Sequence, residues 1–346
     1  MYLTNSWYVA ATALEIGRKP FARTILNEPI VLYRKEDGRP VGFEDRCCHR
    51  QLPLSMGEIQ GDDLICGYHG LRYNPTGKCA AVPGQASPPA GAGVRSYPLL
   101  EKWGFVFIWM GEASKADEEL LPNWPWPDQP GWKIAQNHLV EVDCDYRFIN
   151  DNLIDVTHLA FVHKNSIGVG AIVDFPQDVE ADHRFLRATR WVNDKPCAPM
   201  YQAAGQFTRN VDRAQIVEHT VPCYTVNHAK IYEVGSDEHN GVRTEHVTLS
   251  AATPESETKT HYFFTFARNY ALDDPAVDMI FDRWFIDVIQ EDADILDAQQ
   301  MNYDRFPDGP TVNIAVDKGP MRARKMLDDL ITAEQMTLSP VAGAAE

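Results

Sequence analysis

The sequence lacks an apolar segment long enough to cross a membrane: its 346 residues contain no uninterrupted apolar run of about eighteen. Positive charge is scarce, because 32 Lys and Arg stand against 49 Asp and Glu, giving a net charge of −17. This balance argues against a nucleic acid or an anionic membrane as the main partner. The N-terminus lacks a basic stretch followed by a long apolar one, so no signal peptide is expected. These absences predict a cytoplasmic protein.

Cysteine is not present in the even number that a disulfide framework needs. Seven cysteines in a long chain without an export signal point instead to a metal. Two nucleotide-binding motifs are also missing, since neither a G-x-G-x-x-G at a helix start nor a P-loop occurs. The chain is therefore not expected to bind its own nicotinamide or flavin by these motifs.

The sequence changes texture near residues 115–130. Before that point it predicts short strands separated by turns, at Pro29–Tyr33, Asp63–Cys66 and Phe105–Trp109. A stretch rich in Pro and Trp follows at 122–127 and is typical of a linker. Two domains are predicted, 1–118 and 119–346.

The second domain mixes helices with strands. Strands dominate residues 185–270, and helices are expected at 145–161, 282–300 and 321–336. The predicted fold class is α+β, with a small all-β domain followed by a larger α+β domain that has an antiparallel sheet and helices.

Two Cys-His loops form the first chemical constellation. Cys47 and His49 give C-x-H, and after sixteen intervening residues Cys66 and His69 give C-x-x-H. A Rieske [2Fe–2S] cluster needs two cysteines on one iron and two histidines on the other. A structural zinc site is the alternative, but zinc fingers usually pair cysteine with cysteine and histidine with histidine along the chain. The remaining cysteines are expected to be small buried side chains: Cys48, Cys79, Cys144, Cys197 and Cys223.

Two histidines in the second domain form the other constellation. His158 and His163 are five residues apart, which an ideal helix separates by about 140°. Both bind one metal only if the helix ends or loosens before His163, and residues 164–168 are typical of a helix end. Two histidines with one carboxylate and open positions form the mononuclear non-heme Fe(II) site.

A carboxylate for this site is predicted in the helix at 282–300. Phe281, Phe285, Val288, Asp292 and Ile295 repeat at spacings of 4, 3, 4 and 3, which puts Asp292 on an apolar stripe. A carboxylate facing the core is costly unless it is paired or binds metal, so Asp292 is the favoured third ligand.

The pattern resembles the oxygenase components of Rieske non-heme iron oxygenases, and most of all the subgroup with vanillate O-demethylase and dicamba monooxygenase. The segments that carry the resemblance are 5–10, 66–71, 152–158 and 291–300. One departure is Cys48, where the family often has proline. The resemblance implies a Rieske cluster, a mononuclear Fe(II), a separate NAD(P)H-dependent reductase with or without a ferredoxin, and a head-to-tail homotrimer.

The resemblance also assigns roles near the iron. It implies that electrons pass from the cluster histidine of one subunit, His69, through Asp155 to His158 of the next subunit. Asp155 is then a bridge and not a ligand, although a salt bridge on a helix face is an alternative role. Asn152 matches a family asparagine beside the iron, and a plain amide on a helix face is as good an interpretation.

The implied reaction uses O2 and reductase-supplied electrons to oxidise an aromatic substrate, and the subgroup favours oxidative O-demethylation of a methoxy-aromatic acid. Ring or alkyl hydroxylation and N-dealkylation are alternatives, and an electron carrier without chemistry of its own is a further one. The candidate substrate contacts are Asn227, His228, His261, Phe281, Trp284, Phe285 and Val288.

Overall fold

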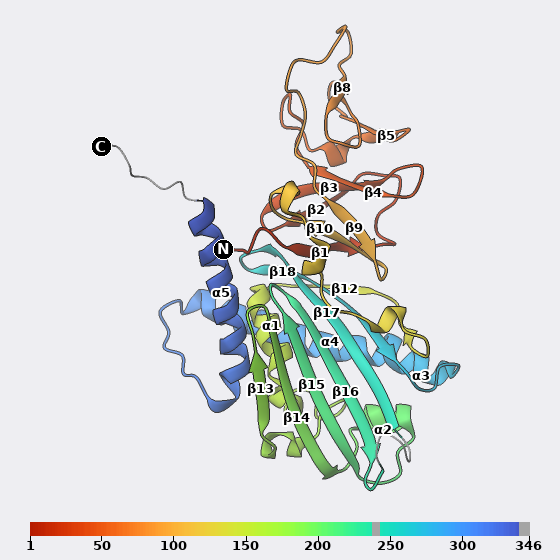
Figure 1. Cartoon of the computed structure of the whole chain (residues 1–346), viewed down its shortest axis with the longest axis vertical. Helices are drawn as coiled ribbons and strands as arrows, with labels where there is room; N and C mark the ends of the chain where they lie inside the picture. The colour runs from red at the N-terminus through yellow and green to blue at the C-terminus, as the bar shows by residue number, and fades with distance from the viewer. Residues whose placement is uncertain (237–242, 339–346) are drawn as a thin grey trace. The chain divides into compact units, whose positions relative to one another are not determined.

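Figure 1 shows the computed structural model of the chain, which describes residues 1–236 and 243–338. Contacts divide the chain into two compact units. The small unit comprises Tyr2–Leu121 and Thr253–Ser256, and the rest of the described chain forms the large unit. No described helix is both long enough and apolar enough to cross a membrane.

The small unit consists of strands joined by turns. Its described strands form three sheets, in the orders β1-β10-β9, β2-β3-β4 and β5-β6-β7-β8. The bounds are β1 Trp7–Thr12, β2 Phe21–Ile25, β3 Glu28–Arg34, β4 Pro40–Glu44, β5 Glu58–Gln60, β6 Asp63–Ile65, β7 Arg72–Tyr73, β8 Cys79–Ala81, β9 Leu99–Lys102 and β10 Phe105–Trp109. Strand β10 is apolar throughout because it is buried along its whole length. The three strands expected from the sequence are confirmed as β3, β6 and β10.

One core of the small unit lies directly below the two Cys-His loops. Tyr33, Phe43, Leu64 and Tyr73 are fully buried in it, and both loop cysteines pack against them. The apolar side chains therefore anchor the loops at their cysteine ends.

The large unit is built on one antiparallel sheet. Its strand order is β11-β18-β17-β16-β15-β14-β13, and β12 also pairs with β18. The bounds are β11 Lys133–Ile134, β12 His138–Val142, β13 Gln177–Ala181, β14 Phe185–Lys195, β15 Val211–Thr220, β16 Tyr224–Glu233, β17 Arg243–Ser256 and β18 Lys259–Arg268. The predicted α+β class with an antiparallel sheet is confirmed.

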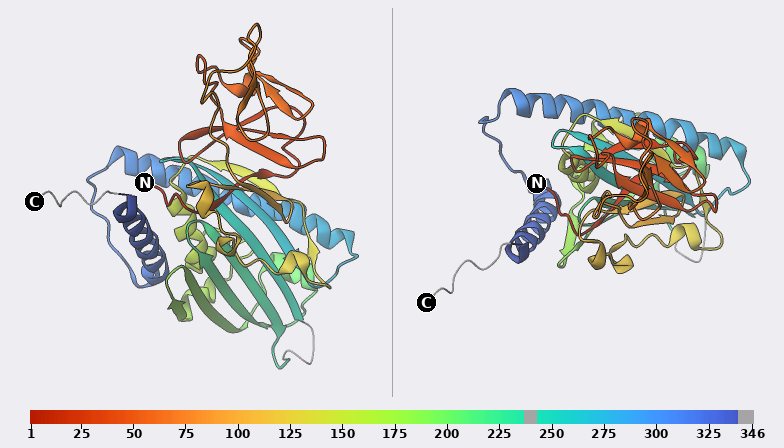
Figure 2. Two further views of the ribbon diagram at one scale, coloured as in Figure 1. Left: turned by 45° about the horizontal axis from the view of Figure 1, so that its top comes forward. Right: turned by 90° about the horizontal axis from the view of Figure 1, so that it is seen from above.

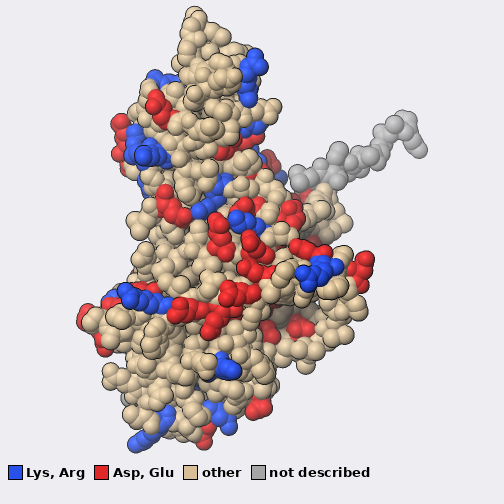
Figure 3. Space-filling model, turned by 180° about the vertical axis from the view of Figure 1, so that it is seen from behind, with Lys and Arg blue, Asp and Glu red and all other residues tan. Residues whose placement is uncertain are grey.

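Helices cover the sheet of the large unit. Their bounds are α1 Tyr146–Ile154, α2 Pro199–Gly205, α3 Pro275–Met279, α4 Phe285–Arg305 and α5 Lys318–Leu338, and a π-helical turn at Ile280–Trp284 leads into α4. Helix α4 runs across one face of the sheet (Figures 1 and 2). Figure 3, which shows the side opposite to the view of Figure 1, shows Asp and Glu side chains gathered on the surface. Helix α4 carries three exposed acids, Asp287, Glu291 and Asp294.

Helix α4 confirms that Asp292 faces the core, with a correction to the predicted stripe. Asp292 is 6% exposed and lies beside buried Phe285 and Val288, but Ile295 is 45% exposed. Successive residues of an α-helix are about 100° apart around the helix axis. Around this axis, the centre of the buried face lies about 40° from Asp292, in the direction of Leu296. Ile295 lies about 100° from that centre, so its side chain is exposed. Leu296 takes the buried position instead.

Candidate metal centres

Two loops of the small unit carry the four predicted cluster ligands, and their backbones follow one pattern. In each loop the cysteine N–H donates to the carbonyl of the residue five positions later. The residue four positions later donates its N–H back to the cysteine carbonyl and has a positive φ, 60° at Gln51 and 70° at Gly70. Cys47 and Cys66 are therefore presented by two copies of the same local turn.

The side chains of these loops separate into a cysteine pair and a histidine pair. Cys47 and Cys66 are each 2% exposed, whereas His49 and His69 are exposed and their ring centroids lie 4.6 Å apart. A Rieske cluster needs this separation, because one iron takes both thiolates and the other takes both imidazoles. The residues therefore fit the predicted [2Fe–2S] group, with the histidines on the solvent side.

Tyr73 supports the thiol side of this site. Its hydroxyl lies 3.1 Å from Sγ of Cys47 and accepts a hydrogen bond from the backbone N–H of Cys48. Burial raises the pKa of Cys47, but hydrogen bonds from Tyr73 and from the His49 backbone outweigh it and lower that pKa. The thiolate is the form that binds iron, so these bonds favour a metal ligand.

The other cysteines only partly match the expectation from the sequence. Cys79, Cys144 and Cys223 are buried, but Cys48 is exposed and Cys197 is half-buried. The expectation of a small buried side chain is wrong at these two positions. For Cys48 the reason is the exposed turn that presents the neighbouring histidine.

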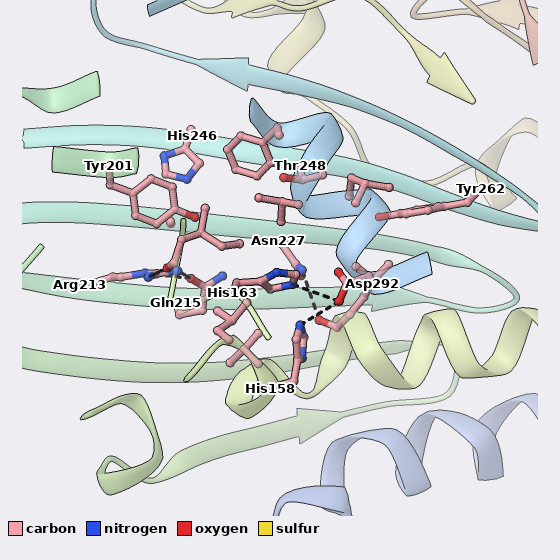
Figure 4. A pocket seen from close by; sticks show the side chains of 18 residues that line it. His158, His163, Tyr201, Arg213, Gln215, Asn227, His246, Thr248, Tyr262 and Asp292 are labelled. Atoms are coloured by element: carbon pink, nitrogen blue, oxygen red, sulfur yellow. Dashed lines mark hydrogen bonds and ion pairs between the residues drawn. The ribbon is translucent and has the colours of Figure 1, made fainter. Parts of the chain in front are cut away.

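His158, His163 and Asp292 converge in the large unit, with ligand atoms within 4.8 Å of one another. Oδ1 of Asp292 lies 3.0 Å from Nε2 of His163 and 3.6 Å from Nε2 of His158 (Figure 4). Two ligands about 2.1 Å from an octahedral ion and at right angles to each other lie about 3 Å apart. The spacing and the donor set therefore fit one mononuclear iron(II).

Both imidazoles are oriented through Nδ1. Nδ1 of His158 lies 2.6 Å from the carbonyl oxygen of Asp155, and Nδ1 of His163 lies 2.6 Å from Oε2 of Glu291. A proton on Nδ1 leaves Nε2 unprotonated and able to bind a metal. Burial lowers the pKa of His163, but the carboxylates of Asp292 and Glu291 outweigh burial and raise it.

A break in the helix brings the two histidines together. The predicted continuous helix at 145–161 is wrong: α1 ends at Ile154, and a 3-10 turn follows at Val156–Ala160. Asp155 causes the break, because its carboxylate accepts hydrogen bonds from N–H and Oγ1 of Thr157 and caps the new turn. The 3-10 turn that carries His158 ends at Ala160, so the loosening that the histidine spacing requires occurs between His158 and His163.

Asn152 lies in the last turn of α1, and its side chain extends to the same centre. Its Nδ2 donates to Oδ1 of Asp292 at 3.0 Å. The amide thus holds the carboxylate in place, and it is not a plain surface group on the outside of the helix.

A small cavity of about 50 Å³ adjoins the three converging side chains. Strands β15–β18, helices α1, α2 and α4 and the 3-10 turn supply most of its wall (Figure 4). Besides the three, its polar wall consists of Tyr201, Arg213, Gln215, Asn227, His246, Thr248 and Tyr262. The volume is below the usual range of ligand pockets, so an aromatic ring enters only when side chains in the wall move.

Three of the candidate substrate contacts line this cavity, namely Phe285, Val288 and Asn227. Phe281 does not: it is buried behind the wall and stacks on Phe285, with ring centroids 5.5 Å apart. Trp284 lies on the π-helical turn and is 51% exposed, so it points to solvent.

The two remaining candidates are also outside the cavity wall, for a reason that lies in the strands. His228 follows Asn227, and His261 precedes Tyr262, both of which do line the cavity. Because successive side chains of a strand point to opposite faces, each histidine faces away from the cavity. Nε2 of His228 lies 3.6 Å from Glu245 there.

An open hollow of about 690 Å³ lies on the other side of His158. Asp155, Asn152 and Arg324 line it together with His158, which also lines the small cavity. His158 therefore belongs to the walls of both the hollow and the cavity.

Several polar residues at this centre were not found from the sequence. Glu291 belongs to the exposed acidic face of α4, and its tie to His163 arises only because His163 packs against that helix. Arg213 and Gln215 lie two apart on β15, which is a detectable strand pattern, but nothing in the pattern says which face meets the cavity.

Two family descriptions match the chain. Residues 142–333 match the vanillate O-demethylase oxygenase C-terminal domain, and residues 6–98 match the Rieske [2Fe-2S] domain. Together they cover the two units that hold the two candidate centres.

Curated relatives span the full length. The chain is 35% identical to a putative toluene-4-sulfonate monooxygenase system iron-sulfur subunit from Comamonas testosteroni, over 98% of this chain and 100% of that protein. It is 33% identical to a vanillate O-demethylase oxygenase subunit of a Pseudomonas strain, over 97% of this chain and 96% of that protein. Among solved structures, dicamba monooxygenase bound to 3,6-dichlorosalicylic acid matches with a TM-score of 0.91 and 27% identity, over 96% of this chain and 99% of that one.

Proposed function

Because the chain belongs to the Rieske non-heme iron oxygenases with a vanillate O-demethylase-type catalytic domain, we propose that it removes a methyl group from a methoxy-aromatic acid by oxidation with O2. One observation carries this proposal: two histidines and a carboxylate converge on the wall of a partly apolar cavity. An electron carrier needs no such cavity.

The cofactors of this family are a Rieske [2Fe–2S] cluster and a mononuclear iron, and the residues present fit both. We assign the cluster to Cys47, His49, Cys66 and His69, and the iron to His158, His163 and Asp292. When bound, the cluster relays single electrons and the iron activates O2 beside the substrate.

The protein's own groups orient the ligands and enclose the substrate. Asn152 holds the Asp292 carboxylate by its amide hydrogen bond, and Glu291 holds His163 through Nδ1. Phe285 and Val288 give the substrate ring an apolar surface and exclude water from the reacting carbon.

As an oxygenase component, the chain depends on a separate reductase. We propose that this reductase uses NAD(P)H, with or without a ferredoxin. We also propose a homotrimer in which the partner subunit's His69 approaches Asp155 and His158. The open hollow supports this arrangement, because Asp155 and His158 line it and its rim carries exposed apolar side chains, Val312 at 84% and Met321 at 48%.

The proposed reaction balances with two electrons and two protons. One oxygen atom is inserted into a C–H bond of the methoxy group, and the other leaves as water. The resulting hemiacetal loses formaldehyde and leaves a phenol.

Methyl hydroxylation of an aromatic sulfonate is a second candidate. It is favoured by the relatives named as toluene-4-sulfonate monooxygenase subunits, which are as similar to this chain as the vanillate enzyme is. It uses the same two electrons and the same oxygen insertion, but its product is an alcohol and no formaldehyde is released.

A single turnover tests the proposal without a matched reductase. The iron-loaded protein is reduced without oxygen, mixed with one of several methoxybenzoates or with toluene-4-sulfonate, and exposed to O2. Formaldehyde and phenol in equal amounts from a methoxybenzoate support O-demethylation, and a benzylic alcohol from the sulfonate supports the second candidate. Oxidation of both metal centres without any organic product contradicts both.

A further inference from the structure

The cavity wall contains one side chain with a fixed positive charge, Arg213 on β15. Arg213 is 4% exposed, and the hydrogen-bond partners of its guanidinium among the described residues are neutral groups. A buried charge without a partner of opposite sign costs several kcal/mol, so an arginine in this place calls for a compensating anion. Asp292 is the one carboxylate on the same wall, and the assigned iron takes it.

The contacts of Arg213 leave part of its guanidinium for a ligand. Nε and Nη2 donate to Oε1 of Gln215, and Nη1 donates to the carbonyl of Ile167 at 3.0 Å. The Tyr201 ring lies beneath it, with Cζ 4.7 Å from the ring centroid. A guanidinium has five N–H donors, and these neutral contacts use three of them. The protein therefore holds the group firmly, yet leaves its charge uncompensated.

The neighbouring polar groups do not supply the missing charge. Nδ1 of His246 and Oδ1 of Asn227 are buried in the same wall, and neither has a hydrogen-bond partner in the described structure. Burial and the adjacent Arg213 hold the pKa of His246 well below its usual value, so its imidazole is neutral. Both atoms offer hydrogen bonds to a ligand but no counter-charge.

The sheet places Arg213 away from the assigned iron. Asn227 on β16 pairs with Val217 on β15, and its side chain donates a hydrogen bond to the Leu153 carbonyl. Leu153 follows Asn152, whose amide bonds to Asp292, so this part of the sheet lies near the assigned iron ligands. Arg213 is four residues from Val217 along β15, which is about 13 Å at about 3.3 Å per residue. Figure 4 shows Arg213 and Gln215 on the side of the cavity opposite to His158 and Asp292.

From this arrangement we infer that Arg213 binds the anionic group of the substrate and selects arenes with a carboxylate or sulfonate at the end opposite to the oxidised carbon. This assignment rests on the proposed function and names the residue that sets its substrate class. Gln215 is a positioning residue in this assignment, because its Oε1 accepts hydrogen bonds from both Nε and Nη2 of the guanidinium.

Binding measurements on the anaerobic, iron-loaded protein test the inference apart from turnover. The probes are benzoate, 4-methoxybenzoate, the neutral 4-methoxybenzamide and toluene-4-sulfonate, titrated by calorimetry. The native protein is expected to prefer 4-methoxybenzoate over its amide by about 100-fold, as expected for a buried charge pair. Comparing carboxylate with sulfonate shows which of the two anions the site takes.

Two substitutions remove the free charge in different ways. Arg213→Met deletes it at similar length, and Gln215→Glu keeps the shape but gives Arg213 a carboxylate within the protein. Both are expected to reduce the preference for the anion to less than about 5-fold, chiefly through weaker anion binding and a higher KM. Arg213→Lys is expected to keep part of the preference for the anion. Bound iron and cluster absorbance confirm that each variant is folded.

Arg190 provides the matched control. It is 3% exposed, lies across from Gln215 in the sheet and donates to a backbone carbonyl, but it does not line the cavity. Arg190→Met is expected to keep the anion preference. The inference is overturned if the native protein shows no preference, if Arg213→Met retains it, or if Arg190→Met alone removes it. Binding of benzoate that depends on Arg213, without any demethylation, leaves the inference standing and contradicts only the proposed reaction.

Discussion

The two candidate centres differ in how their ligands are brought together. All four proposed ligands of the cluster site come from residues 47–69, and hydrogen bonds inside each loop set the backbone geometry around the cysteines. The iron site joins His163 to Asp292, which is 129 positions away, through packing of α4 against the sheet and a broken helix. The cluster site is thus local, whereas the iron site depends on the fold of the whole large unit. This difference predicts that the two centres are lost independently.

The largest effect is expected from Asp292→Ala. It removes the carboxylate that faces both imidazoles, so mononuclear iron is lost, about one third of the total, while the red-brown cluster stays. Turnover falls to background. Iron analysis with visible absorption measures both centres. The reciprocal Cys66→Ser is expected to lose the cluster absorbance and to keep mononuclear iron; loss of both centres in either variant would contradict the independence of the two sites.

Asp155→Asn is expected to leave both centres occupied and to reduce steady-state turnover at least about 100-fold. The Asp155 carbonyl that orients His158 remains, and an asparagine side chain still caps the 3-10 turn at Thr157, but the negative charge facing the hollow is lost. Turnover with excess reductase, alongside iron content, measures the effect. Normal turnover in a fully metallated variant would remove Asp155 from electron transfer. Thr157→Val serves as the control, because it keeps the carboxylate.

A smaller effect is expected at Glu291, the partner of the His163 Nδ1. Glu291→Ala removes an orienting carboxylate outside the ligand set, which typically weakens metal binding by about 10- to 100-fold. Glu291→Gln keeps an acceptor oxygen and should lose less. Chelator competition for the mononuclear iron measures the affinity. Asp294→Ala, an exposed acid on the same helix, is the control; an equal loss there would mean that only the general acidity of α4 matters.

The same difference explains what the sequence could predict. The loops at 47–69 have their ligands, spacing and turns in one stretch, so the cluster residues and the β-rich unit around them are visible in the sequence. Asp292 was detectable because a carboxylate interrupts an apolar stripe. The strand-borne candidates fared worse: Asn227 lines the cavity but His228 does not, and only the observed register distinguishes these neighbours.

Two other features needed the fold for physical reasons. Asp155 ends α1 because its side chain caps the next turn, and local helical periodicity does not reveal such a break. Arg213 looks like an ordinary charged strand residue until β15 is placed against the cavity, where the described residues around its guanidinium offer it neutral partners only. The roles of Asp155 and Arg213 therefore depend on the groups that surround them in the folded structure, and residue type alone does not reveal them.

The two units also differ in how deeply their histidines are buried, and this difference predicts how the stability of each unit depends on pH. The small unit's histidines, His49 and His69, are exposed, whereas His219 in the large unit is 2% exposed and burial lowers its pKa to about 4. The unfolded chain, with a histidine pKa of about 6.5, then binds more protons than the folded one between these values. Stability is therefore lost as pH falls below about 6.5, by about 2 kcal/mol at pH 5.

This loss is expected to depend on His219 and to be confined to the large unit. His219→Gln keeps a partner for Thr225 Oγ1 but cannot be protonated, so it should remove about 2 kcal/mol of the difference in stability between pH 7 and pH 5. Urea unfolding followed by tryptophan fluorescence measures it, and cluster absorbance reports the small unit separately. His183→Gln, at an exposed position, should change neither. If acid releases the cluster before the large unit loosens, the local site is the weaker one, and the contrast between a self-contained loop pair and a fold-dependent iron site is reversed.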